Sequence, residues 1–186
     1  MPRLLTILAL ALGLLACATG ATTSGPAKLR AVDYHPLAVG NQWTYAVKGQ
    51  TTDRTVTIKA IKDGYFSDDE NGMLKVDAEG LRDEKRYLLK EPVERGKTWT
   101  SVVSVSSTEH YQIMDVGFTV TTQAGTFANC VLVRGTNRID QSRSLVLEWT
   151  FAPDVGIVRF GSSMVEGGKS IPQVVTELKS YKLVKP

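Results

Sequence analysis

Beyond about residue 32, apolar and polar residues alternate in short segments that are rich in Val, Thr, Ile, Tyr and Phe. Residues 43–47 and 56–60 are two such segments, and a polar turn at 48–53 lies between them. A period of two is typical of half-buried antiparallel strands, in which successive side chains point to opposite faces. Because Gly, Asp, Asn and Pro interrupt the pattern about every ten residues, the chain predicts an all-β fold. We expect a single curved, mainly antiparallel sheet, a half-barrel or barrel-like meander with little helix.

Two chain reversals can be placed from their residues. Gln123 to Gly125 separates two apolar segments and predicts a hairpin, in which the glycine allows a tight turn. Pro153 and Gly156 mark a second reversal between two apolar segments. The remaining strands are expected at residues 72–78, 85–90, 99–106, 111–122, 126–134, 144–151, 156–161 and 173–183.

One sequence pattern occurs twice, because residues 36–44 and 92–100 both fit P-[LV]-x-x-G-x-x-W-T. The proline fixes φ, the glycine permits a tight turn, and the tryptophan follows where a strand begins. Each copy predicts a bend that leads into a strand, whether the two copies arose by duplication or by convergence on one turn type. We interpret Trp43 and Trp99 as core residues at opposite parts of the sheet rather than as ligand-stacking residues.

The first residues of the chain have the features of a secretory leader. Arg3 precedes an uncharged apolar stretch at residues 4–15. This stretch has the length of a signal-peptide core and is shorter than the roughly 20 residues that span a bilayer. Cys17 follows it closely, and residues 18–27 are small, uncharged and without a periodic pattern.

The segment Leu14-Leu15-Ala16-Cys17 resembles the lipobox of bacterial lipoproteins. The resemblance implies that a diacylglyceryl group is attached to the thiol of Cys17 and that the leader is cut just before it. The organisation is then a signal peptide at 1–16, a lipidated cysteine and flexible tether at 17–31, and a single β domain at 32–186. Several acyl chains on one residue hold a protein on a membrane, because each buried methylene contributes about 0.8 kcal/mol.

An ordinary signal peptide, cleaved near Ala16 or Ala18, is the alternative and would give a soluble protein. In lipoproteins of two-membrane bacteria, an Asp after the lipidated cysteine commonly retains the protein in the inner membrane, whereas this chain has Ala18. The resemblance therefore implies a location in the cell envelope, lipid-anchored at the outer membrane and facing the periplasm.

Three further motifs resemble those of a broad group of uncharacterised secreted proteins and lipoproteins of bacteria. The motifs are P-L-x-x-G-x-x-W-x-Y, A-G-T-F-x-x-C and W-[YF]-A-P-x-V-G-x-V-[KR]. The last one departs by a residue here, since Thr150 follows Trp149. Because the motifs consist of turn and core residues, the resemblance implies a shared β fold and no catalytic set, and some members are similar at fold level to the curved half-barrels of lipoprotein carriers. The matching residues are Pro36, Leu37, Gly40, Trp43, Tyr45, Ala124, Gly125, Thr126, Phe127, Cys130, Ala152, Pro153, Val155, Gly156, Val158 and Arg159.

Composition and charge exclude one class of partner. The chain has 186 residues, of which 42% are hydrophobic and 22% are charged, and its net charge is +3. This is an ordinary globular composition, and because the basic residues form no stripe we expect no nucleic-acid partner. Cys130 lies in the apolar segment 127–133 and is expected to be a small buried hydrophobe.

No residue pattern predicts a metal ion, a cofactor or catalysis. The two histidines, His35 and His110, lack partners at metal-ligand spacing, and Glu109 should point to the opposite face of its strand from His110. Residues 67–72 carry three carboxylates, but without the spacing of a calcium loop we expect them to form a solvated turn. Since no nucleophile, phosphate-loop or dinucleotide motif occurs, we expect a protein that is not an enzyme and has no cofactor.

The sequence thus favours a non-enzymatic, membrane-anchored envelope lipoprotein that binds or scaffolds another component. The alternative is a carrier that holds an apolar ligand or lipid in a cavity of the curved sheet. The partners are the membrane, through the lipid on Cys17, and an envelope protein or an apolar ligand. A third class, an envelope hydrolase, requires catalytic groups that converge around His35 or His110. The bulky residues expected to fill the interior or to line a pocket are Trp43, Trp99, Trp149, Phe118 and Phe127.

Overall fold

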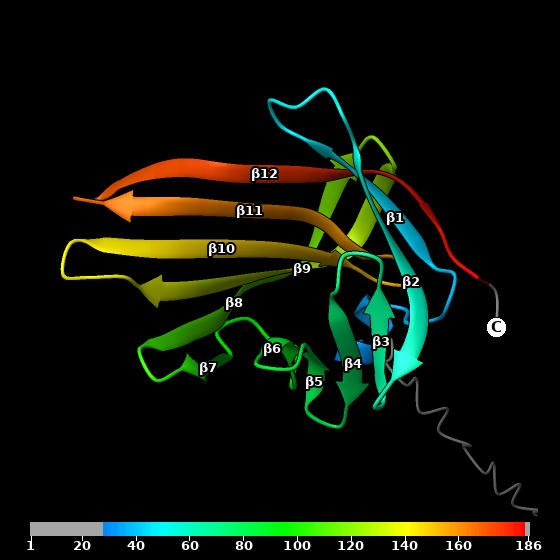
Figure 1. Cartoon of the computed structure of the whole chain (residues 1–186), viewed down its shortest axis with the longest axis horizontal. Coiled ribbons are helices and arrows are strands. Elements are labelled where there is room, and N and C mark those ends of the chain that lie inside the picture. The colour runs from blue at the N-terminus through cyan, green and yellow to red at the C-terminus, as the bar shows by residue number, and fades with distance from the viewer. Residues whose placement is uncertain (1–27, 185–186) are drawn as a thin grey trace, which may run out of the picture.

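The alternating segments form one antiparallel sheet of twelve strands in the computed structural model, which describes residues 28–184 (Figure 1). The strand order is β6-β5-β4-β3-β2-β1-β12-β11-β10-β9-β8-β7, so the β1 to β12 pair joins the two ends of the described chain. The predicted all-β, antiparallel fold is confirmed. The strands are β1 (Gln42–Val47), β2 (Arg54–Lys62), β3 (Tyr65–Asp68), β4 (Met73–Asp77), β5 (Gly80–Arg82), β6 (Tyr87–Lys90), β7 (Thr98–Ser104), β8 (Ser107–Thr122), β9 (Gly125–Arg138), β10 (Arg143–Ala152), β11 (Gly156–Glu166) and β12 (Lys169–Lys182).

The two edge strands, β6 and β7, follow one another in the chain, and side chains join them across the seam. Trp99 Nε1 in β7 donates a hydrogen bond to Tyr87 O in β6 at 2.9 Å. Nearby, Arg86 Nη1 donates to both carboxylate oxygens of Glu109 in β8, at 2.8 and 2.9 Å. Glu109 is buried, and the Arg86 guanidinium compensates its charge. The sheet therefore curls into a nearly closed barrel.

The strands differ in length, which gives the barrel a long side and a short side. β8 has 16 residues and β9 and β12 have 14 each, whereas β3 to β6 have three to five. Strands β2 to β4 face the long strands at one end of the molecule, and the hairpins of β9 to β12 extend past them at the other (Figure 1). Within residues 28–184, no helix is long and apolar enough to cross a membrane.

The described chain begins with a turn of 3-10 helix, η1 (Ala31–Tyr34), that is packed against the barrel. The predicted tether ends at residue 31, whereas Ala31 is 1% exposed and its N–H donates to Glu91 Oε1 at 2.7 Å. Leu29 also packs against the core. Ala31 and, in part, Leu29 are therefore packed against the barrel. The predicted lipidation residue Cys17, the signal peptide and the rest of the tether lie outside the described residues.

Buried side chains form two clusters inside the barrel, and the two tryptophans of the repeated pattern lie in different clusters. Trp43 belongs to one of them, and Trp99 belongs to the other, where its ring stacks on Tyr111 with centroids 5.3 Å apart. This confirms the prediction of core residues at separate parts of the sheet. Cys130 is fully buried, as predicted, and its thiol donates to Phe127 O at 3.3 Å.

Candidate ligand-binding cavity

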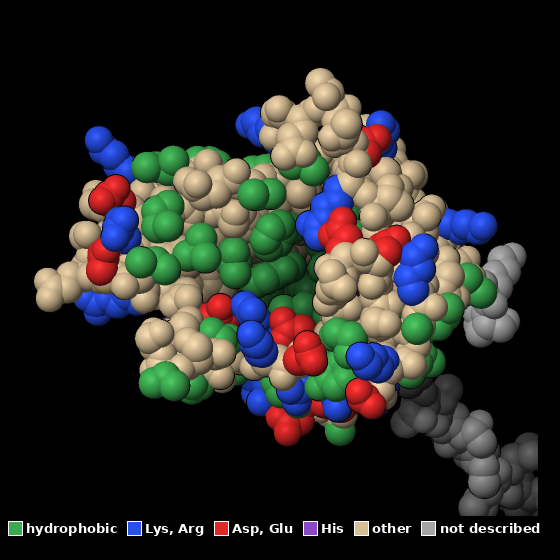
Figure 2. Space-filling model, in the orientation of Figure 1, with side chains coloured by type: hydrophobic (Ala, Val, Ile, Leu, Met, Phe, Trp, Pro, Cys, Tyr) green, Lys and Arg blue, Asp and Glu red, His purple; other side chains and the backbone are tan. Residues whose placement is uncertain are grey.

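A cavity of about 230 Å³ opens on the concave face of the barrel, between the short strands and the long ones. Figure 2 shows it as a hollow whose walls are hydrophobic and whose rim carries charged side chains. Of its 14 lining residues, ten are apolar or aromatic. An enclosed apolar space with few polar groups is the usual form of a small-molecule site, so this cavity is the candidate functional site.

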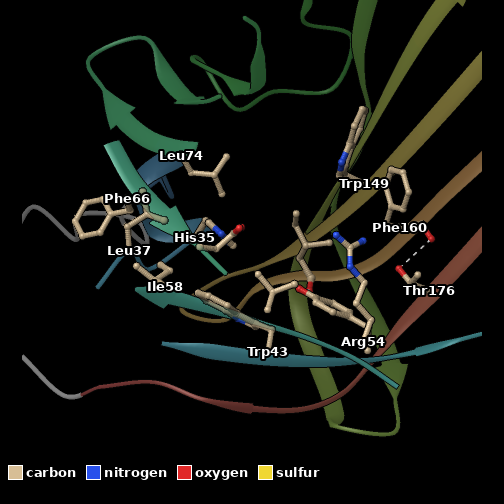
Figure 3. A pocket seen from close by; sticks show the side chains of 14 residues that line it. His35, Leu37, Trp43, Arg54, Ile58, Phe66, Leu74, Trp149, Phe160 and Thr176 are labelled. Atoms are coloured by element: carbon tan, nitrogen blue, oxygen red, sulfur yellow. Dashed lines mark hydrogen bonds between the residues drawn. The ribbon is translucent and has the colours of Figure 1, made fainter. Parts of the chain in front are cut away.

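Two groups of strands supply the cavity walls. Trp43 in β1, Ile58 in β2 and Leu74 in β4 form one side, and Trp149 in β10 and Phe160 in β11 form the other (Figure 3). Because every second residue of a strand points to the interior face, the alternation that predicts the strands also places these side chains in the cavity. The two sides meet through the β1 to β12 pairing, which joins segments from opposite ends of the chain.

The polar atoms of two aromatic side chains in the wall are bonded to the backbone. Trp43 Nε1 donates to Val155 O at 2.6 Å, and the Tyr45 hydroxyl donates to Ile157 O at 3.0 Å. Burial raises the pKa of Tyr45, so that its hydroxyl stays protonated. With these atoms satisfied, the rings offer apolar surface to the cavity, which favours an apolar occupant over ordered water.

His35 is a second buried titratable group of the cavity wall. Its ring is 4% exposed and stacks on Trp43 with centroids 5.0 Å apart, and Nδ1 is buried without a hydrogen-bond partner. Burial lowers the pKa of His35 to about 4, because the charged imidazolium is poorly solvated there. His35 is therefore neutral at neutral pH and adds no charge to the cavity.

We expect the stability of the domain to fall as the pH drops from about 6.5 to about 4. The unfolded chain binds a proton at the ordinary histidine pKa, whereas folded His35 resists protonation until about pH 4. Protons therefore favour the unfolded state across this window, at a cost of about 3 kcal/mol in the free energy of unfolding. Urea denaturation at a series of pH values measures the slope.

The second histidine supplies the control for this pH dependence. His110 is exposed, so a His110→Gln variant should keep the slope, whereas His35→Gln should remove the part of it that lies between the two pKa values. A slope that survives in His35→Gln and disappears in His110→Gln would contradict the assignment.

Arg54 in β2 is the basic residue of the cavity rim, and its charge is already paired. Its Nε donates to Glu70 Oε2 at 2.6 Å, and this hydrogen bond raises the pKa of the guanidinium. The side chain is about half exposed, so the pair contributes little to stability. The rim therefore presents the balanced Arg54 and Glu70 pair, and Asp68 adds a carboxylate to the lining of the cavity.

The acidic segment at residues 67–72 comprises the end of β3 and the turn that leads into β4. Asp68 Oδ1 accepts hydrogen bonds from the N–H groups of Glu70 and Gly72 at 2.9 and 2.7 Å, and Asp69 Oδ1 accepts one from Thr57 N at 2.8 Å. The carboxylates of Asp68 and Asp69 therefore accept hydrogen bonds from backbone N–H groups. Across residues 28–184, no group of three or more His, Cys, Asp or Glu side chains is placed to hold a metal ion.

Glu109 and His110 point to opposite faces of β8, as their adjacency predicts. Glu109 lies inside the barrel, where it also accepts a hydrogen bond from the Tyr111 hydroxyl, whereas His110 is outside and is 3.3 Å from Thr100 Oγ1. In the part of the chain that the structure describes, neither His35 nor His110 is hydrogen-bonded to a serine or a carboxylate.

The structure separates the bulky residues that the sequence singled out. Trp43 and Trp149 line the cavity, whereas Trp99 is part of the filled core. Phe118 and Phe127 pack beside the Trp43 cluster and are not among the lining residues. The interior is therefore a filled core over part of its length and a cavity over the rest.

Comparisons with known proteins find similarity at the level of structure. No protein-family model matches the chain, and no curated protein matches its sequence. A protein from Bacteroides fragilis, named as exported and with a YmcC-like fold, is similar with a TM-score of 0.43 and 15% identity, over 81% of this chain and 99% of that one. A protein from Parabacteroides distasonis, named as a lipoprotein, is similar with a TM-score of 0.40 and 13% identity, over 80% and 97%.

Proposed function

We propose that this protein is a lipid-anchored protein of the bacterial cell envelope whose β domain carries an apolar ligand and catalyses no reaction. The observation that supports the carrier is the apolar cavity between Trp43 and Trp149. A domain that served only as a scaffold would gain stability by filling this space, because an unfilled void loses packing contacts. The open, apolar cavity therefore favours the carrier over the scaffold.

The location in this proposal depends on the N-terminal sequence. The lipobox ending at Cys17 supports a thioether-linked anchor, and Ala18 in place of Asp supports the outer membrane, facing the periplasm. A carrier held at the membrane surface remains close to a source of apolar molecules. The partners in the proposal are the membrane, through the lipid on Cys17, and the apolar ligand.

Native mass spectrometry of the protein purified from cells tests the carrier function. We expect an additional mass that is released as a lipid or another apolar molecule on denaturation. A Val56→Trp substitution places a large ring in the cavity wall and should reduce the occupancy about tenfold, equal to about 1.4 kcal/mol of binding free energy.

Thr55→Trp is the matched control, because Thr55 is the preceding residue of β2 and points to the outer face, where it contacts Thr44. This variant should retain the ligand. A single ligand-free mass in every preparation, with the cavity intact, would contradict the carrier and support the scaffold.

A further inference from the structure

The apolar surface of the cavity continues beyond its mouth along the long hairpins. Trp149, Phe160 and Thr176 form one row across β10, β11 and β12, and all three line the cavity. Because the side chains of a strand alternate, the next two rows outward on the same face can be read from the strand register. We call these rows the trough; they consist of Leu147, Ser162 and Val174, followed by Leu145, Met164 and Ile171.

The trough is exposed over its outer part and is apolar at five of its six positions. Val174 and Ile171 are 39% and 49% exposed, and Leu145, Leu147 and Met164 are partly buried. Figure 2 shows hydrophobic side chains in a band that runs from the hollow toward the tips of the long strands. Four residues separate Trp149 from Leu145 along β10, which corresponds to about 14 Å of strand.

The next row closes the trough with charges. Arg143 pairs with Glu166 in the register of β10 and β11, and Glu166 pairs with Lys169 in that of β11 and β12. Arg143 also forms an ion pair with Asp140, at 2.7 Å between Nη2 and Oδ2. The apolar path thus begins in the cavity, runs along three strands and ends at polar groups that face solvent.

From this path we propose that the ligand is a linear long-chain amphiphile, whose acyl chain has its end in the cavity and its remaining length in the trough. The inference rests on the proposed carrier function and names the chemical class of its ligand. The cavity of about 230 Å³ is below the roughly 300–1,000 Å³ of pockets that enclose whole ligands, so a longer molecule must extend from it. The trough is the apolar surface that continues from its mouth.

The chemistry of the trough favours a hydrocarbon over a peptide strand. β1 pairs with β12 only as far as Thr176, and Lys48 N donates to Val175 O just beyond it, so the outer part of β12 is an open edge. That edge carries Pro172, which has no N–H, and a bulge where the pairing with β11 shifts between Ser162 and Ser163. Both features oppose the addition of another strand. An acyl chain needs no backbone partners, and the trough offers it none.

Binding of octanoate, laurate and palmitate to the full chain carrying Cys17→Ser, purified without detergent, tests the proposal by calorimetry. Each methylene that becomes buried should tighten binding about fourfold, so affinity should increase from octanoate to palmitate. Val174→Glu combined with Ile171→Glu should weaken palmitate binding at least about tenfold and leave octanoate binding nearly unchanged. These residues are half exposed, so thermal unfolding should remain close to that of the parent chain.

Val175→Glu is the matched control, because Val175 is 40% exposed, lies next to Val174 and points to the opposite face. It should leave the binding of all three acids unchanged. Equal affinities for the three acids, unaffected by the Val174 and Ile171 substitutions, would overturn the trough and leave the carrier in place. If none of the three acids binds, the proposal that the trough holds an acyl chain is wrong. The carrier function itself is contradicted by a different result, a ligand-free mass in native mass spectrometry. A dimer of this chain that the Val174→Glu change disrupts, without acid binding, would assign the trough to a second copy and overturn the proposal.

Discussion

Replacement of Gly156 by alanine is expected to destabilise the domain by about 3 kcal/mol or more, through backbone strain and overpacking. Gly156 has a φ of +115°, where a side chain is strained in any surroundings. A Cβ at this position would lie 2.5 Å from His35 Nδ1 and 3.2 Å from Trp43 Nε1. His35 is stacked on Trp43, and Trp43 Nε1 donates a hydrogen bond to Val155 O. Neither ring can therefore move away without losing these contacts. The midpoint of urea denaturation measures the loss.

Gly161 in the same strand is the control for this substitution. Its φ is not positive, and an added Cβ would touch only Val174 O at 3.9 Å, so Gly161→Ala should change the free energy of unfolding by less than about 1 kcal/mol. A double variant, His35→Ala with Gly156→Ala, should regain part of the loss because it removes the closest contact. A Gly156→Ala protein as stable as the parent would show that the β10 to β11 turn is not packed on the His35 ring.

The consequence for the site is that the β10 to β11 turn packs against His35 and Trp43, two residues of the cavity wall. Gly156 allows this turn to approach His35 and Trp43, and Val155 O then satisfies the indole of Trp43. The sequence explains Gly156 only as a turn residue, since a turn motif states the φ that is needed and not the ring that lies against it. We therefore expect its replacement to affect ligand binding as well as stability.

Strand periodicity made most of the fold predictable from the sequence. The segments at 43–47 and 56–60 are β1 and β2, and both reversals, at 123–125 and 152–156, separate paired strands. Two short strands were missed. β5 (Gly80–Arg82) has only three residues, too few to show a period, and β3 (Tyr65–Asp68) has its two aromatic residues side by side rather than alternating.

The cavity was less predictable than the fold because its walls come from distant parts of the chain. Trp149 could be read from the sequence as a residue that fills the interior or lines a pocket, and the structure shows that it lines one. Arg54, Leu74 and Phe160 were not singled out. They reach the cavity through the pairing of β1 with β12, a long-range contact that leaves no local pattern.

The residues of the trough could not be predicted from the sequence either. Val174 and Val175 are adjacent, similar in size and similarly exposed, and the alternation of β12 assigns one to each face. The pairing of β12 with β1 and β11 determines which of its faces is concave. The bulge between Ser162 and Ser163 also shifts the β11 to β12 register, so the facing of residues beyond the bulge cannot be counted from Val174 by simple alternation. Only the assembled sheet identifies Val174 and Ile171 as continuations of the cavity surface.

The largest expected change in location comes from Cys17→Ser. We expect this substitution to move the protein from the membrane fraction to the soluble fraction or to an uncleaved precursor, because a serine hydroxyl cannot carry the thioether-linked diacylglyceryl group. Several acyl chains hold effectively permanently at about 0.8 kcal/mol per buried methylene, so their loss should remove nearly all of the membrane-bound protein. Fractionation with immunoblotting, together with the intact mass of the purified protein, measures both location and modification.

The second cysteine provides the control for this experiment. Cys130 is fully buried in the β9 segment of the core, so Cys130→Ala should leave a small cavity, lower stability modestly and keep the protein on the membrane. A Cys17→Ser protein that stays in the membrane fraction, or a parent protein whose mass shows an unmodified Cys17 thiol, would remove the anchor from the proposal. The cavity and the trough would keep their ligand chemistry in that case, because they are built from residues 28–184 alone. The proposed carrier would then be free to diffuse with its ligand rather than held beside a membrane.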